Sequence, residues 1–106
     1  MTEIVVALTT VPADFDVLAL ARELIGWHAA ACVTVLPPVQ SVYEWDGVVT
    51  VDREQQLLIK TTQGKVEELW QMLRARHPHQ VPEFLVIPVL EGNPVYLKWI
   101  EERVVS

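Results

Sequence analysis

Cysteine is nearly absent from this chain of 106 residues, which contains only Cys32. A single cysteine cannot form a disulfide within the chain, nor can it supply the C-x-x-C pairs of zinc and redox motifs. This composition is compatible with a reducing compartment, and we expect a cytoplasmic protein. Cys32 lies between Ala31 and Val33, where a cysteine usually serves as a small buried hydrophobe, although its thiol is also a candidate metal ligand.

Basic residues are also few, with 8 Lys and Arg against 14 Asp and Glu and a net charge of -6. Nucleic-acid binding depends on clustered Lys and Arg, so we expect no nucleic-acid partner. No apolar run approaches the roughly 20 residues of a membrane span, and the first residues lack the features of a secretory signal. We therefore expect no membrane partner.

Catalytic motifs are missing as well. The chain has no glycine-rich phosphate loop, no G-x-S-x-G, and no nucleophile with a base beside it. We therefore expect a protein that is not an enzyme and that has no obligatory cofactor.

Apolar surface is what the chain has in excess, since 51% of its residues are hydrophobic and four are tryptophan. A chain of this length forms a single domain, here residues 1–106, and buries only about 60 to 70% of its unfolded surface. Its core cannot hide so much apolar surface, so we expect oligomerisation.

The first half of the chain alternates short strands with a helix. Residues 4–10 and 30–36 are rich in β-branched side chains, as buried strands are. Between them, Asp14 is expected to cap a helix that reaches residue 25, with Gly26 just beyond its end.

An extended hairpin is predicted next. Tyr43 and Trp45 lie on one face of an extended stretch because they are two residues apart. Asp46-Gly47 is a strong hairpin signal, so residues 48–51 should return beside this stretch and residues 55–62 should continue the strand.

The second half begins with apolar residues at helical spacings, which end at His77. Pro78 disfavours helical conformation at His77, so the helix should stop there. Residues 83–90 predict a last strand, in which Pro88 indicates an edge or a bulge, and Asn93 is expected to cap a C-terminal helix. The order β-α-β-β-α-β is the ferredoxin-like arrangement, an α+β fold.

Five blocks of sequence, taken together and in order, resemble the CutA family of divalent-cation tolerance proteins. They are A-C-V-T at 31–34, S-V-Y-E-W-D-G at 41–47, L-I-K-T at 58–61, H-P-H-Q-V-P-E at 77–83 and Y-L-K-W-I at 96–100. The resemblance implies a ferredoxin-like subunit, a tight homotrimer like that of the signalling protein PII, and a role in tolerance of copper and other divalent metal ions.

The same resemblance bears on the metal site. The family's proline-rich block reads close to H-P-Y-E-x-P-E, whereas this chain has His79 and Gln80 at the aromatic and acidic positions. Some relatives have a proposed copper site made of a cysteine and two adjacent histidines. The corresponding positions here are Thr9, Arg76 and His77, of which only His77 is a ligand for copper.

We therefore expect a weak site for Cu(II) or another divalent metal ion. His77 and His79 are its main candidate ligands, because alternate residues of an extended segment can face one side. Cys32 or Glu83 is a candidate third ligand. The alternative for His77 is a structural role at the end of a helix, where the dipole favours a cation.

A cleft between subunits is the second expected site. The resemblance favours a pocket at this place, and its candidate residues are aromatic or polar: Tyr43, Trp45, Lys60, His77, Glu83 and Trp99. Three functions stay open at this point: a metal-responsive protein, a small-molecule sensor of the PII type, and a trimeric scaffold.

Overall fold

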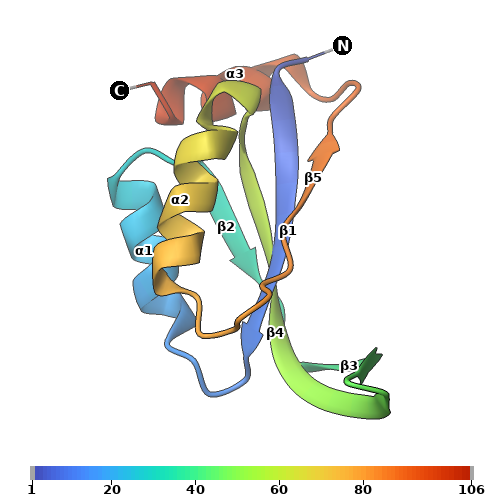
Figure 1. Cartoon of the computed structure of the whole chain (residues 1–106). Helices are drawn as coiled ribbons and strands as arrows, with labels where there is room; N and C mark the ends of the chain where they lie inside the picture. Colours follow the sequence, from blue (N-terminus) through green and yellow to red (C-terminus); the bar gives the residue numbers. More distant parts are fainter. Residues whose placement is uncertain (1, 106) are drawn as a thin grey trace.

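The computed structural model describes residues 2–105, which form an antiparallel sheet with two helices on one face and a third helix across one end (Figure 1). The strands are β1 (Ile4–Pro12), β2 (Cys32–Val35), β3 (Val39–Trp45), β4 (Val48–Thr62) and β5 (Leu85–Pro88). The helices are α1 (Val17–Gly26), α2 (Val66–Arg76) and α3 (Pro94–Arg103), and a short 3-10 turn, Gln63–Lys65, precedes α2. The ferredoxin-like prediction is confirmed.

The sheet has the order β2-β4-β1-β5, and all its neighbouring strands are antiparallel. The strand predicted at residues 30–36 corresponds to β2, and the extended stretch predicted after Pro37 and Pro38 corresponds to β3. Both strands pair with β4, β2 at Leu57–Lys60 and β3 at Val48–Glu54.

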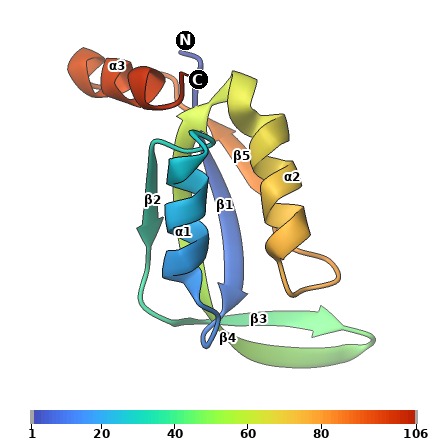
Figure 2. The same ribbon diagram turned by 90° about the vertical axis from the view of Figure 1, so that its left-hand side faces the viewer.

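The hairpin of β3 and β4 extends beyond the sheet as a two-stranded arm (Figure 2). β1 pairs with β4 only as far as Glu54, so β3 is the strand that pairs with Val48–Arg53 within the described chain. The turn lies at Asp46 and Gly47, whose φ angles are 51° and 79°, as a two-residue hairpin turn of the mirror-image type requires.

Several predicted boundaries move in the structure. The cap of α1 is Asp16 and not Asp14: the Asp16 carboxylate accepts a hydrogen bond from the Ala19 N–H at 3.2 Å. β1 continues to Pro12, and a turn in which the Phe15 N–H donates to the Pro12 carbonyl delays the helix. Gly26 is the last residue of α1 rather than the first beyond it.

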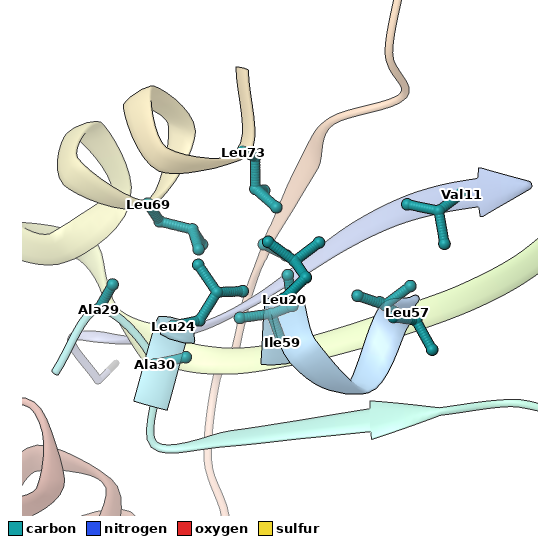
Figure 3. Packing of buried hydrophobic residues seen from close by; sticks show 11 residues of the cluster. Val11, Leu20, Leu24, Ala29, Ala30, Leu57, Ile59, Leu69 and Leu73 are labelled. Atoms are coloured by element: carbon teal, nitrogen blue, oxygen red, sulfur yellow. The ribbon is translucent and has the colours of Figure 1, made fainter. Parts of the chain in front are cut away.

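The main core lies between the sheet and the helix pair α1 and α2 (Figure 3). Leu20 and Leu24 of α1 and Leu69 and Leu73 of α2 pack on strand residues such as Ile59. A smaller cluster, made of Ile4, Ala31, Ile100 and Val104, holds α3 against the end of the sheet. α1 and α2 lie on the same face of the sheet, and α3 crosses its end, where Tyr96 approaches Lys60 of β4 (Figure 1).

β5 is shorter than predicted, and within residues 2–105 it pairs only with β1, over Val5–Leu8. The prediction of an edge strand from Pro88 is therefore confirmed. Residues 77–84, which precede β5, run past the end of the sheet from which the arm projects (Figure 2).

Candidate functional site

A cleft of about 570 Å³ lies between the arm and the segment that connects α2 to β5. The arm contributes one wall and residues 79–83 contribute the other. The polar lining consists of Thr10, Ser41, Tyr43, Asp52, Glu54, His79, Gln80 and Glu83, and the apolar lining of Val42, Trp45, Val81 and Pro82.

The arm presents hydroxyl and carboxylate groups to each other on one face. Ser41 pairs directly with Asp52 in the ladder and Tyr43 pairs with Thr50, so these side chains point to the same side. The Ser41 hydroxyl donates to Glu54 Oε2 at 2.6 Å, and the Tyr43 hydroxyl donates to Asp52 Oδ2. The hydrogen bond to Asp52 favours the protonated phenol and raises the pKa of Tyr43 above its ordinary value.

His77 does not line the cleft, but it holds the start of the segment 79–83 that forms the second wall. α2 ends at Arg76, and His77 has the extended backbone that a following proline favours. Its Nε2–H donates to the Thr10 carbonyl at 2.6 Å, and its Nδ1 accepts from the His79 N–H at 3.1 Å. Because one ring nitrogen donates and the other accepts, the ring is held as the neutral tautomer with its proton on Nε2.

Partial burial lowers the pKa of His77 below its ordinary value, because desolvation penalises the imidazolium. The nearby His79 acts in the same direction, whereas the hydrogen bond to Thr10 and the charge of Glu54 oppose it. The rings of His77 and His79 lie 4.9 Å apart between centroids. His77 is thus a structural support for the segment, and His79 is the histidine that lines the cleft.

Gln56 is a supporting residue that the sequence analysis did not identify. Its Nε2 donates to Glu83 Oε2 at 3.1 Å and to the Thr9 carbonyl at 2.9 Å. One amide group therefore ties the carboxylate of Glu83 to β1. The sequence feature that could have identified Gln56 is its position just before the apolar run that begins at Leu57. A side-chain amide next to a buried strand needs hydrogen-bond partners.

The charge of the cleft is strongly one-sided. Asp52, Glu54 and Glu83 contribute three carboxylates, and no Lys or Arg belongs to the lining within the described chain. Glu54 is only 7% exposed, yet its hydrogen-bond donor is the neutral hydroxyl of Ser41. The lining of the cleft is therefore negatively charged.

The structure separates Cys32 from the two histidines. Cys32 pairs with Lys60 in the ladder between β2 and β4, and its sulfur lies 3.9 Å from the Thr34 hydroxyl. Across residues 2–105, no three His, Cys, Asp or Glu side chains are grouped closely enough to hold a metal ion. The chain by itself therefore does not bring Cys32, His77 and His79 together.

Thr9 and Arg76 occupy the other two positions that correspond to the copper site proposed for some relatives, and neither provides a ligand for copper. Thr9 is fully buried, and its hydroxyl has no hydrogen-bond partner among the described residues. Arg76 forms an ion pair with Glu23 of α1.

The residues proposed for an intersubunit pocket form two groups within the chain. Tyr43, Trp45 and Glu83 line the cleft, and His77 supports it. Lys60 and Trp99 belong to an aromatic ladder at α3 and do not line it: the Lys60 Nζ lies 5.6 Å from the ring centroid of Tyr96, which stacks on Trp99 at 5.7 Å.

Among residues 2–105, the helices lack the length and apolar character that a membrane span requires.

Comparison with known proteins matches residues 5–103 to the model of a family described as CutA1 divalent ion tolerance protein. A "Divalent-cation tolerance protein CutA" from Thermus thermophilus is 40% identical over 98 residues, which cover 92% of this chain and 95% of the relative. The solved structure of a Thermus thermophilus divalent cation tolerance protein, Cut A1, has a TM-score of 0.92 at 38% identity, covering 96% of this chain and 99% of that one. A structure titled "PII-like protein CutA" from Nostoc has a TM-score of 0.87 at 32% identity, covering 95% of this chain and 97% of that one.

Proposed function

Because the chain belongs to the CutA1 family of divalent ion tolerance proteins, we propose that it acts in the response of its cell to divalent metal ions. It does so without enzymatic turnover, by binding these ions weakly at the cleft between the arm and residues 79–83. The observation that carries the proposal is the lining, which combines three carboxylates and an imidazole with no Lys or Arg in the described chain.

His79 is the imidazole that we assign to the metal ion. Both ring nitrogens of His77 already take part in hydrogen bonds, so a metal ion could bind His77 only by displacing Thr10 or the His79 N–H. Copper has the highest affinity of the divalent first-row metals for such ligands, and we expect Cu(II) to be preferred. Because no three ligand groups are clustered within residues 2–105, binding should be weak.

A homotrimer is part of the proposal. The face of the arm opposite to Tyr43 carries two largely exposed valines, Val49 and Val51, and a two-stranded ribbon cannot cover both of its own faces. A second copy that packs on this face would bury them. The expected intersubunit pocket would then receive Lys60 and Trp99 from a neighbouring copy. The cytoplasmic location expected from the composition belongs to the same proposal.

A small-molecule sensor of the PII type is the second candidate. The volume of the cleft favours it, because about 570 Å³ lies in the range of pockets that hold small molecules and greatly exceeds what one ion needs.

Titration calorimetry of metal-free protein with Cu(II) tests the first proposal. We expect a dissociation constant that is micromolar or weaker, and binding that weakens as the pH falls, because protons compete with the metal ion for its ligands. His79→Ala should remove most of this binding. His28→Asn is the matched control, because His28 lies outside the cleft and asparagine tolerates its φ of 59°. Equal copper binding by the parent and His79→Ala would contradict the proposal.

A further inference from the structure

The turn at the tip of the arm places an aspartate directly before a glycine. Asp46 and Gly47 are the only Asp-Gly pair in the sequence, and the other three aspartates precede Phe15, Val17 and Arg53. The carboxyl carbon of an aspartate and the amide nitrogen of the next residue can close a five-membered ring. A side chain on that next residue hinders the closure, and glycine has none.

The amide of Gly47 is accessible in the folded chain. Asp46 and Gly47 are both exposed, with φ angles of 51° and 79°. Apart from the chain neighbours of Gly47, no atom of the described chain lies within 4 Å of the position that a Cβ would take there. The ladder of the arm ends with the pair Trp45 and Val48, so the Gly47 N–H lies outside it.

The other aspartates are held in ways that oppose the same reaction. Asp14 and Asp16 precede N–H groups that donate to main-chain carbonyls at 3.0 and 2.8 Å, and the carboxylate of Asp16 also caps α1. Asp52 lies inside β4, where its carboxylate accepts a hydrogen bond from a tyrosine of the arm. The only asparagine, Asn93, precedes a proline, which has no N–H.

From these observations we propose that Asp46-Gly47 is a site of spontaneous isoaspartate formation. The Gly47 nitrogen attacks Cγ of the protonated Asp46 carboxyl group. A C–N bond forms, and the amide proton and the hydroxyl group leave together as water. Water then opens the resulting succinimide ring. Cleavage at Cγ restores aspartate, and cleavage at the main-chain carbonyl gives isoaspartate, so water is the only co-reactant.

The modification should release the arm. In isoaspartate the main chain passes through Cβ and Cγ and is one carbon longer, whereas the length and type of a turn fix the register of its hairpin. Within the described chain, β3 alone pairs with Val48–Arg53, and a lone two-stranded hairpin is marginally stable. Trp45 and Val48 should therefore separate, while β4 stays paired with β1. The inference does not depend on metal or small-molecule binding.

The first test is to incubate the assembled protein for several weeks at neutral pH. Mass spectrometry with electron-transfer fragmentation then locates isoaspartate. We expect it at residue 46 and a loss of detectable signal at Asp14, Asp16 and Asp52. Asp46→Asn is the positive control, because asparagine closes the same ring with loss of ammonia and reacts faster. Asp46→Gly is the negative control, because glycine tolerates the φ of 51° and has no carboxyl group.

The second test is hydrogen exchange of the same incubated samples. We expect a second population, in proportion to the isoaspartate content, that loses protection over residues 42–51 and keeps it over residues 55–62. Incubated Asp46→Gly should show a single population with a protected arm.

The absence of isoaspartate at residue 46 of the parent would overturn the proposal, including the case in which a neighbouring copy covers the turn. Equal formation at Asp46 and Asp52 would also overturn it, because the turn would then have no special role. A fully protected arm in the isoaspartate population would refute the release of the arm. The copper titration uses freshly prepared protein, so either proposal can fail while the other stands.

Discussion

Replacing His77 with alanine should destabilise the fold without touching the lining of the cleft. The ring of His77 forms two hydrogen bonds, one to the Thr10 carbonyl at 2.6 Å and one from the His79 N–H at 3.1 Å. Each such bond contributes about 1 kcal/mol net, so the free energy of unfolding should fall by about 2 kcal/mol. The neighbouring variant His79→Ala keeps both bonds, because the His79 donor is its backbone N–H.

The stabilisation by His77 should also depend on pH. Its pKa in the folded protein is lowered by burial below the ordinary value of 6.5, so the unfolded chain takes up the proton first as the pH falls. The contribution is therefore complete above a pH of about 6.5 and is lost as the pH falls through the lower, folded pKa. This part of the acid dependence should be missing in His77→Ala.

The assay is urea denaturation followed by circular dichroism, at one protein concentration, with a chelator present, between neutral pH and a pH of about 5, which lies below the ordinary pKa of histidine. A fixed concentration is needed because the stability of an oligomer depends on it. A magnetic-resonance titration of the His77 ring gives its pKa directly. The reasoning is refuted if His77→Ala and His79→Ala lose equal stability, or if His77 titrates above its ordinary value.

Three further substitutions examine the arm and the core. Val51→Asp should dissociate the trimer, as measured by sedimentation. Leu18→Asp on α1 is the control and should leave the trimer intact, because Leu18 is 55% exposed and Val51 is 58% exposed. Equal effects of the two substitutions would show that the arm does not form the interface. Gly47→Ala should cost about 1 kcal/mol in urea denaturation because of its φ of 79°, and Gly64→Ala, which has free space around it and no positive φ, should not destabilise. Leu24→Ala should cost about 3 kcal/mol in the same assay because Leu24 is fully buried, and a loss below about 1 kcal/mol would contradict this.

Local signals in the sequence were sufficient where a residue and its neighbour set the backbone. Pro78 ends α2 at Arg76, and Asn93 caps α3 through a hydrogen bond from the Val95 N–H, both as predicted. Asp46-Gly47 forms the hairpin turn because both residues adopt positive φ. Each of these features depends on interactions within a few residues, so the sequence contains all the information needed.

The same local rules could not choose between equivalent residues. Asp14 and Asp16 are both good helix caps, and the sequence analysis selected the wrong one. The choice depends on how far β1 continues beside β4. β1 reaches Pro12, which pairs with Glu54 of β4. That pairing joins residues far apart in the chain, whereas the capping propensity of a residue reflects only its local sequence.

The composition of the cleft was decided by the tertiary structure. Strand periodicity correctly placed Tyr43 and Trp45 on one face, but it does not state which segment lies opposite that face. The fold brings Glu83 and Gln56 together across 27 residues of sequence. It places Lys60, farther along β4 than Glu54, beside Tyr96 and away from the cleft. Alternation along a strand determines the side on which a residue lies, whereas the packing of separate segments determines which charges meet there.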